Sequence, residues 1–118
     1  MTIAGVSLGE RSAEAARDWQ DWVSLGFSTA GVLTRYDFGK RLFPITVVFN
    51  QMIYATVQSL ETALQTAKIG GTIAVVPDAG DDLGCGISGS TNMVFMGYHA
   101  DFVGGGYWKV VINLQYIP

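Results

Sequence analysis

The stretch GGGYWKVVINLQYIP, from Gly104 to Pro118, decides how this chain is expected to fold. Every second residue in it is large and apolar: Trp108, Val110, Ile112, Leu114 and Tyr116. Because successive side chains of a β-strand point to opposite faces, the spacing predicts a strand with one fully apolar face. The opposite face is mixed rather than polar, and it holds Lys109, Val111, Asn113, Gln115 and Ile117.

The residues just before this stretch predict its partner strand. The segment MVFMGYHADF, residues 93–102, also alternates, and it predicts one face with Val94, Met96, Tyr98, Ala100 and Phe102. Gly104 to Gly106 then supply a permissive turn. We therefore expect an antiparallel hairpin built from these two strands.

One amphipathic helix is predicted over about residues 53–68. A single apolar stripe is drawn by Ile53, Val57, Leu60, Leu64 and Ala67. Gly70 and Gly71 follow and are typical of a helix C-terminus. Since one such helix cannot make a core alone, we expect it to pack on a sheet.

Two further regions are predicted to be strands. GTIAVVP is a short β-branched strand that ends at Pro77, and VLTRYDFGKRLFPITVVFN is interpreted as two strands around a turn at Asp37 to Lys40. Gly39 is the permissive residue of that turn. Pro44 has no N–H to donate, so its strand is expected to begin at an edge or a bulge.

The first 31 residues are predicted to be an N-terminal arm or helical segment, separate from a domain over residues 32–118. TIAGVSL fits a short strand or an extended arm, and GERSAEAARDWQDW fits a helix or a docked arm. On a helix, Trp19 and Trp22 would share a face and require a partner surface. The predicted fold class is α+β, a mainly antiparallel β-sandwich with one helix packed on the sheet.

Composition indicates a surface that other molecules cover. Apolar residues form 49% of the 118 residues and charged residues only 14%, with a net charge of −3. So little charge predicts apolar surface packed against other copies or proteins. Arg35, Lys40 and Arg41 are the only local basic group, interpreted as solvated hairpin charges, so nucleic-acid binding is not predicted. No apolar run has the length of a membrane span. The chain has one cysteine and no signal-peptide pattern, which favours a reducing cytoplasm.

The candidate chemical groups predict no catalytic, cofactor or metal site. Asp78, Asp81 and Asp82 share a glycine-rich loop but lack the spacing of a calcium loop. A nucleophilic set of Cys85, His99 and Asp101 can be drawn, with His99 and Asp101 on one face of a strand. A sugar-stacking platform of Trp108, Tyr107 and Tyr98 is a further alternative.

From about Val32 to Pro118 the chain resembles the small minor tail and distal tail proteins of long-tailed bacteriophages. The resemblance rests on the order of TRYDFGKR, LFPITVVF, ATVQSLETALQTAK, GTIAVVPDAG, NMVFMGYHADF and YWKVVINLQYIP. The family's glycine–aspartate–glycine–tyrosine hairpin is present only as YDFGKR. The loop from Asp78 to Thr91 is longer than in the family pattern, and an insertion there would reach a neighbouring subunit.

The resemblance implies a structural role without enzymatic activity. It implies a tail-tube-like sandwich that forms a trimeric or hexameric ring at the tip or baseplate end of the tail tube. The implied partners are other copies and other tail proteins, and the implied location is the virion tail after synthesis in the host cytoplasm. A tail terminator or tube subunit is the nearest alternative. The interface candidates are Trp19, Trp22, Arg35, Lys40, Arg41 and Trp108.

Overall fold

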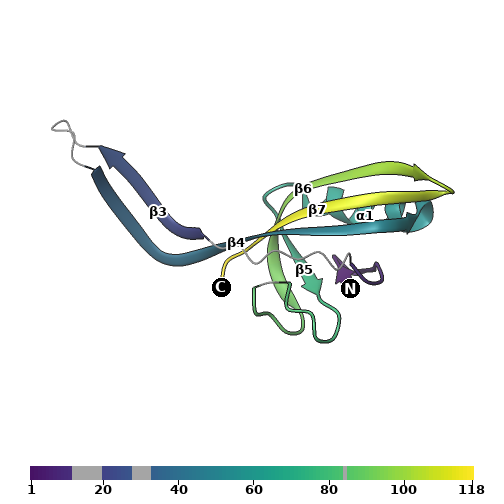
Figure 1. The fold of residues 1–118 in the computed structure, drawn as a ribbon, viewed down its shortest axis with the longest axis horizontal. Coiled ribbons are helices and arrows are strands. Elements are labelled where there is room, and N and C mark those ends of the chain that lie inside the picture. Colours follow the sequence, from purple (N-terminus) through teal and green to yellow (C-terminus); the bar gives the residue numbers. More distant parts are fainter. Residues whose placement is uncertain (12–19, 28–32, 84) are drawn as a thin grey trace.

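The described residues form seven strands in one antiparallel hydrogen-bonded order, and a single helix (Figure 1). The computed structural model describes residues 1–11, 20–27, 33–83 and 85–118, and for 20–27 and 33–41 it describes the backbone alone. The elements are β1 (Thr2–Ile3), β2 (Val6–Ser7), β3 (Gln20–Phe27), β4 (Leu33–Ile53), α1 (Tyr54–Ala67), β5 (Thr72–Val76), β6 (Thr91–Gly104) and β7 (Tyr107–Tyr116). The strand order is β2-β1-β5-β6-β7-β4-β3. The predicted α+β, mainly-β class is confirmed.

The predicted helix is confirmed within a residue at each end. Val57, Leu60 and Leu64 are buried, and α1 packs against β2, β4 and β7. The chain leaves the helix through Lys68, which has a φ of 63°. Gly71 follows in a close approach, because a Cβ there would lie 2.1 Å from the carbonyl oxygen of Ala67. Only glycine fits at position 71 without movement of the helix end.

The β6–β7 hairpin is also confirmed, but one face of β6 differs from the prediction. Met93 and Phe95 are buried, whereas Met96 is 47% exposed. A register shift between Phe95 and Gly97 then moves the inward position by one residue, so that Tyr98 packs on the core. A bulge of this kind reverses the alternation, which is why Val94 and Met96 do not share the inner face with Tyr98.

The predicted turn at Asp37 to Lys40 is wrong, because β4 is one strand of 21 residues that passes through it. Asp21 pairs with Arg41 and Val23 pairs with Asp37, so the residues around Gly39 form an irregularity opposite β3. The glycine signal therefore marks a bulge rather than a chain reversal. The connection between β3 and β4 falls in residues 28–32, outside the described residues.

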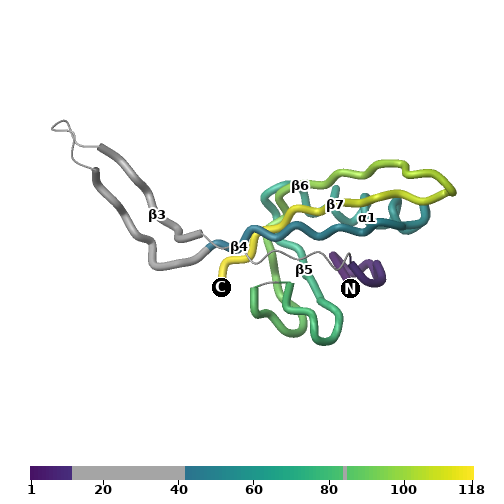
Figure 2. Tube along the Cα trace, in the orientation of Figure 1, coloured from purple at the N-terminus to yellow at the C-terminus, as the bar shows by residue number. Residues whose placement is uncertain are grey.

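The long strand β4 has two different neighbours along its length. Its first half pairs with β3 as far as Leu42, and its second half pairs with β7 from Phe43 to Ile53. Figure 2 shows the second half beside β7, with the C-terminus close to the start of this pairing. Pro44 does not begin its strand as predicted, because β4 passes through it and Pro44 pairs with Gln115 of β7. It lies two residues after Leu42, the last residue paired with β3, so among the described strands only β7 pairs with β4 at this point.

The N-terminal residues join the sheet. β1 pairs with β5, and Met1 and Ile3 belong to the buried core. Residues 20–22, predicted as part of a helix or arm, are strand in β3, while residues 12–19 lie outside the described residues.

The core is a single apolar cluster that draws on β1, β4, α1, β5, β6, β7 and the loop of residues 77–90. Val110, Ile112 and Leu114 of β7 are all buried, which confirms the predicted apolar face of that strand. Leu83 and Ile87 of the loop are buried in the same cluster. The loop from Asp78 to Thr91 therefore contributes to this chain's own core, and its expected reach to a neighbouring subunit stays a prediction.

Candidate interaction site at the aromatic end

A group of exposed apolar side chains gathers where β4 ends, α1 begins and β6 turns into β7. These elements meet at one end of the molecule, on the right of Figure 1. The exposed side chains are Ile53 (55%), Tyr54 (54%), Phe102 (62%), Val103 (53%) and Tyr107 (41%). Together with Trp108 we call them the aromatic end. Exposed apolar side chains that gather in this way are typical of interaction surfaces. Trp108 and Phe102 pair in register and lie on one face of the sheet, whereas Ile53 and Tyr107 pair with each other and lie on the opposite face.

Trp108 holds the aromatic end together. Its ring stacks on Tyr54 at 6.0 Å between centroids and meets the edge of Phe102 at 5.4 Å. Trp108 is itself half-buried against the core, and it pairs with Phe102 across the β6–β7 hairpin. The three rings are therefore positioned before any partner arrives, which lowers the entropic cost of binding.

The turn of this hairpin depends on glycine. Gly104, Gly105 and Gly106 have φ values of 94°, 64° and 79°. Three consecutive residues in the left-handed region are costly for any residue with a side chain, so this turn requires glycine.

Charges border the aromatic end without entering it. Asp101 pairs in register with Lys109, and it also accepts a 2.9 Å contact from His99 Nε2. The His99 and Asp101 side chains are 68% and 61% exposed, so solvent screens this pair. The expectation that these two side chains share a strand face is confirmed. Cys85 lies elsewhere, in loop 77–90, where its Sγ contacts the carbonyl oxygen of Asp82 at 3.4 Å.

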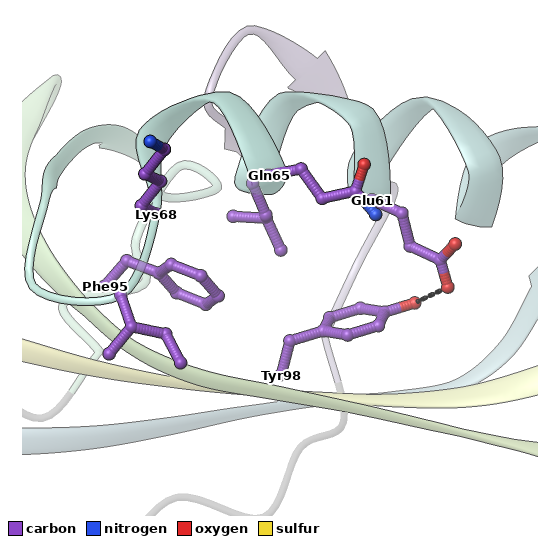
Figure 3. Close-up of a pocket in the computed structure, with 7 residues that line it drawn as sticks. Glu61, Gln65, Lys68, Phe95 and Tyr98 are labelled. Carbon is purple, nitrogen blue, oxygen red and sulfur yellow. Dashed lines mark hydrogen bonds between the residues drawn. The ribbon is translucent and has the colours of Figure 1, made fainter.

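A cleft of about 500 Å³ lies between α1 and β6 (Figure 3). Its floor is apolar, with Leu64 and Phe95 buried, and Ile69 is 72% exposed beside it. Tyr98 donates a hydrogen bond of 2.9 Å to Glu61 Oε1 across the cleft. Burial raises the pKa of Tyr98, and the hydrogen bond to the carboxylate raises it further. The phenol therefore stays neutral and ties the helix to the sheet.

The sugar-stacking alternative requires Trp108, Tyr107 and Tyr98 on one surface, and they do not form one. Tyr98 pairs with Ile112, four residues along β7 from Trp108, which corresponds to about 13 Å. Tyr107 precedes Trp108 directly, so the two side chains leave opposite faces of the strand.

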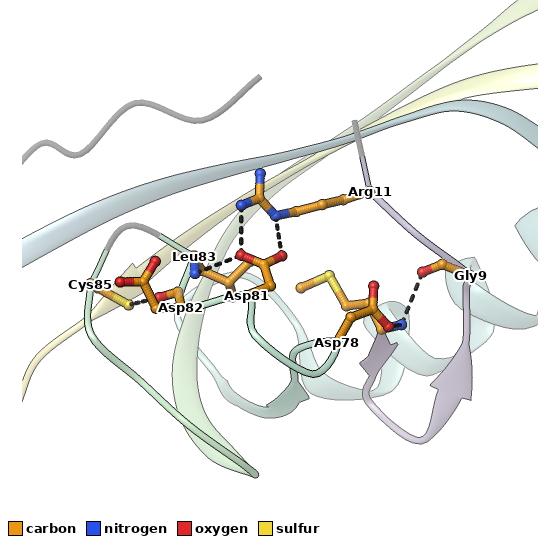
Figure 4. Close-up of polar contacts among 8 residues, drawn as sticks. Gly9, Arg11, Asp78, Asp81, Asp82, Leu83 and Cys85 are labelled. Carbon is orange, nitrogen blue, oxygen red and sulfur yellow. Dashed lines mark hydrogen bonds and ion pairs between the residues drawn. The ribbon is translucent and has the colours of Figure 1, made fainter. Parts of the chain in front are cut away.

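The N-terminal segment is fixed to loop 77–90 by charge (Figure 4). Arg11 donates to Asp81 through Nε at 2.6 Å and through a terminal nitrogen at 2.7 Å. The Leu83 N–H donates to the same carboxylate at 3.0 Å. These hydrogen bonds, the one from Arg11 first, hold the pKa of Asp81 below its usual range, and the same pairing raises the pKa of Arg11.

Asp78 has a similar role, because its carboxylate accepts from the Met1 ammonium, which also donates to the Gly9 carbonyl. The calcium alternative required these carboxylates to face a metal. The Met1 ammonium contacts Asp78 and the Arg11 guanidinium contacts Asp81 instead, and no group of three metal-ligating side chains gathers in the described residues.

Comparison with known proteins assigns no family to this chain. No family model, curated protein or solved structure matches it. In the part of the chain that the structure describes, no helix is long and apolar enough to cross a membrane. Any functional conclusion therefore depends on the geometry of the protein itself.

The predicted interface residues fall in two places. Trp108 is the centre of the aromatic end, while Trp22 lies in β3 and Arg35, Lys40 and Arg41 lie in β4, where only the backbone is described. Trp19 lies outside the described residues. Four residues of the aromatic end were not predicted from the sequence: Ile53, Tyr54, Phe102 and Val103. Ile53 and Phe102 continue patterns that are typical of core positions. The dense aromatic residues on either side of the three glycines were the available signal.

Proposed function

We propose that this protein is a structural subunit of the tail of a long-tailed bacteriophage, without enzymatic activity. In this proposal, copies associate into a trimeric or hexameric ring at the tip or baseplate end of the tail tube. Other tail proteins bind the ring, and the chain is made in the host cytoplasm before it enters the virion. A tail terminator or tail-tube subunit is the alternative within the same class.

One observation carries the proposal: the β3–β4 hairpin. Among the described strands, β3 pairs only with β4, and no other strand pairs with β4 between Leu33 and Leu42. A two-stranded hairpin is marginally stable at best in water when nothing packs against it. About half of the 21-residue strand β4 lies in this hairpin. Contact with a second subunit would stabilise that half.

The sequence composition supports the same conclusion. Charged residues make up only 14% of the chain, and the aromatic end is exposed. Both features suit a subunit that is covered on assembly. The net charge of −3 also suits a conduit that should not retain DNA, since attraction to phosphate requires basic residues.

The proposal also includes a more specific fold, a β-sandwich. We expect the sheet to bend into a tail-tube-like β-sandwich, with β1 and β5 on one side and β4 and β7 on the other. The support is that buried residues from both pairs of strands form one core cluster. Bulges in β4 and β6 would provide the bends.

The test is the mass of the purified protein by light scattering over a range of concentrations, with electron microscopy of the particles. A discrete trimer or hexamer that appears as a ring is the expected result. A monomer at every concentration, which also fails to associate with purified tail tubes, would reject the proposal.

A variant at Trp22 sharpens the test. We expect Trp22→Ala to weaken assembly more than it lowers the melting temperature, because tryptophan is frequent among interface hot spots. Trp22→Phe is the matched control and should retain most of the assembly. Equal losses of assembly and thermal stability in Trp22→Ala would place this residue in the monomer's own core.

A further inference from the structure

We infer that β6 of one copy pairs with β6 of a second copy, antiparallel and in a single register, so that two sheets join across a two-fold axis. The pairing uses the segment Tyr98–Phe102, whose sequence is YHADF. This inference goes beyond the proposed ring and does not rest on it. Three such dimers would make a hexamer, and without a ring the same contact leaves a dimer.

Beyond Val94, no strand of the described residues lies beside the outer edge of β6. β5 pairs with β6 only as far as this residue, whereas β7 pairs with the opposite edge as far as Gly104. The Phe95 carbonyl then accepts from the Gly70 N–H at 2.7 Å, and the Phe95 N–H donates to the Gly71 carbonyl at 2.8 Å. From there β6 runs along the margin of the sheet (Figure 1). Backbone N–H and C=O groups at such an edge are a template for another strand.

This open edge is regular along its length. Register shifts interrupt β6 between Phe95 and Gly97 and again between Phe102 and Gly104, so residues 97–102 pair with β7 without a break. Natural edge strands often carry proline or lysine, which prevent further pairing, and this segment has neither. The edge therefore favours the addition of a strand.

The segment is complementary to itself when it is reversed. Its two ends, Tyr98 and Phe102, are aromatic, and Ala100 is its centre. Antiparallel pairing about Ala100 places Tyr98 of one copy opposite Phe102 of the second. It also places His99 opposite Asp101, and the two-fold axis repeats each pair. Cross-strand pairs of rings and of opposite charges stabilise a sheet, and the two-fold axis makes the contact isologous.

The faces of β6 and its charges select this register. Tyr98 and Ala100 pack on the core side, whereas the side chains of His99 and Asp101 are 68% and 61% exposed on the outer face. A slip of one residue would bring the core side of one copy opposite the outer face of the other. A centre at Asp101 would set two carboxylates against each other, and a centre at His99 would pair that residue with itself. Only the centre at Ala100 pairs histidine with aspartate.

The helix leaves space for the rings of a second copy. α1 packs against β2, β4 and β7, and the cleft of about 500 Å³ separates it from β6. Tyr98 lines this cleft, so Phe102 of the second copy would lie beside it. The Phe102 side chain is 62% exposed in one copy and would be covered in the pair. At the centre, the small side chain of Ala100 allows the two strands to approach.

The first experiment changes the charges on the outer face of β6 in the full-length protein. The acidic variant is His99→Asp and the basic variant is Asp101→Lys. The matched control is His99→Asp with Asp101→His, which reverses the order of the two side chains and leaves the segment complementary to itself. Because both positions are mostly exposed, all three proteins should stay folded by circular dichroism.

Analytical ultracentrifugation measures the dissociation constant of the two-fold contact, from dimer to monomer or from hexamer to trimer. Each single variant alone should associate at least about 10-fold more weakly than the wild type, because two pairs of opposite charge are lost. An equal mixture of the two variants should restore the contact, since the acids of one chain then face the bases of the other. The control should associate like the wild type.

Oxidative cross-linking tests the register in a Cys85→Ala background. In Ala100→Cys the two new thiols lie directly opposite each other, where Cα atoms are about 4.5–5.5 Å apart and a disulfide can form. Phe102→Cys is the control, because its two thiols would lie four residues apart along the strands, which corresponds to about 13 Å. Covalent dimers are expected on non-reducing gels for Ala100→Cys alone.

Three results would overturn the inference. A wild type that is monomeric at every concentration would leave the edge of β6 for a strand of another protein, while binding to purified tail tubes would still support the proposed ring. Unchanged association of both charge variants would place the contact between copies elsewhere and leave the ring proposal intact. Cross-linking through Phe102→Cys in preference to Ala100→Cys would reject the register. Conversely, wild-type dimers that never close into rings would support this inference and reject the ring.

Discussion

The core of this protein is closed on one side and open on another. Beside loop 77–90, Leu83 and Ile87 are only 4% and 7% exposed, and the Arg11–Asp81 ion pair holds the N-terminal segment close by. At the aromatic end, Tyr54 and Phe102 are 54% and 62% exposed, although both contact Trp108, which packs against the same core. The first side has a loop to cover it, and the second has none among the described residues.

The two sides also differ in the contacts that order them. The covered side uses a two-point ion pair between residues that are 70 positions apart in the sequence. The aromatic end lacks such a cover, and its rings are instead arranged by contacts with Trp108. The aromatic end is therefore ordered by contacts among its own rings, while much of its apolar surface stays exposed.

The largest loss of stability is expected at the centre of the core. Leu60 is fully buried in α1, and Leu60→Ala should lower the free energy of unfolding by about 2–5 kcal/mol because it leaves a cavity. Denaturant unfolding measures the change. Gln58→Ala, on the exposed face of the same helix, is the control and should change stability little. A near-zero effect of Leu60→Ala would mean that α1 does not cover the sheet.

A smaller effect is expected on the closed side. Asp81→Asn should cost about 1–3 kcal/mol at neutral pH, because charge-assisted hydrogen bonds from Arg11 are weakened. Asp101→Asn is the control, since that carboxylate is exposed and should contribute little.

The pH dependence of this loss has a definite sign. The folded-state pKa of Asp81 is lowered, so its stabilisation is fully present above the unfolded-state value of about 4. It disappears as the pH falls through the folded-state pKa. The wild type and Asp81→Asn should therefore converge in stability in acid, and a constant difference at all pH values would contradict the ion-pair explanation.

The smallest effect on stability is expected at the open end. Phe102→Ser removes one edge-to-face contact with Trp108 from a side chain that is mostly in water, so it should cost at most about 1 kcal/mol. Thermal unfolding of the isolated variant measures this cost. A loss of stability as large as that of Leu60→Ala would show that the aromatic end belongs to the core. The two sides of the core would then not differ in how well they are packed.

Much of the fold was predictable because its signals are local. The stripe of Val57, Leu60 and Leu64 repeats with the helical period, and the alternation in β7 repeats with the strand period. Both patterns depend only on neighbours in the chain and on one buried face. The helix, the closing hairpin and the mainly-β class followed from them.

The errors arose where a partner strand sets the geometry. Gly39 gave the same signal for a turn and for a bulge, and only pairing with β3 distinguishes the two. Gly97 similarly follows a shift in β6 that is measured against β7. Of the candidate site, Trp108 was predicted, but Phe102 and Ile53 could not be separated from core positions by periodicity alone.

Local patterns in the sequence are enough to predict the mainly-β class of the fold and the extent of the helix, and the composition shows a low content of charge. Which apolar residues are buried follows from the packed structure, because burial depends on elements that are distant in the chain. Arg11 ties the N-terminal segment to loop 77–90, whose Leu83 and Ile87 lie in the core, while Tyr54, Phe102 and Trp108 meet at the other side with no such loop over them in the described residues. Periodicity specifies a face, and packing alone specifies what lies against it.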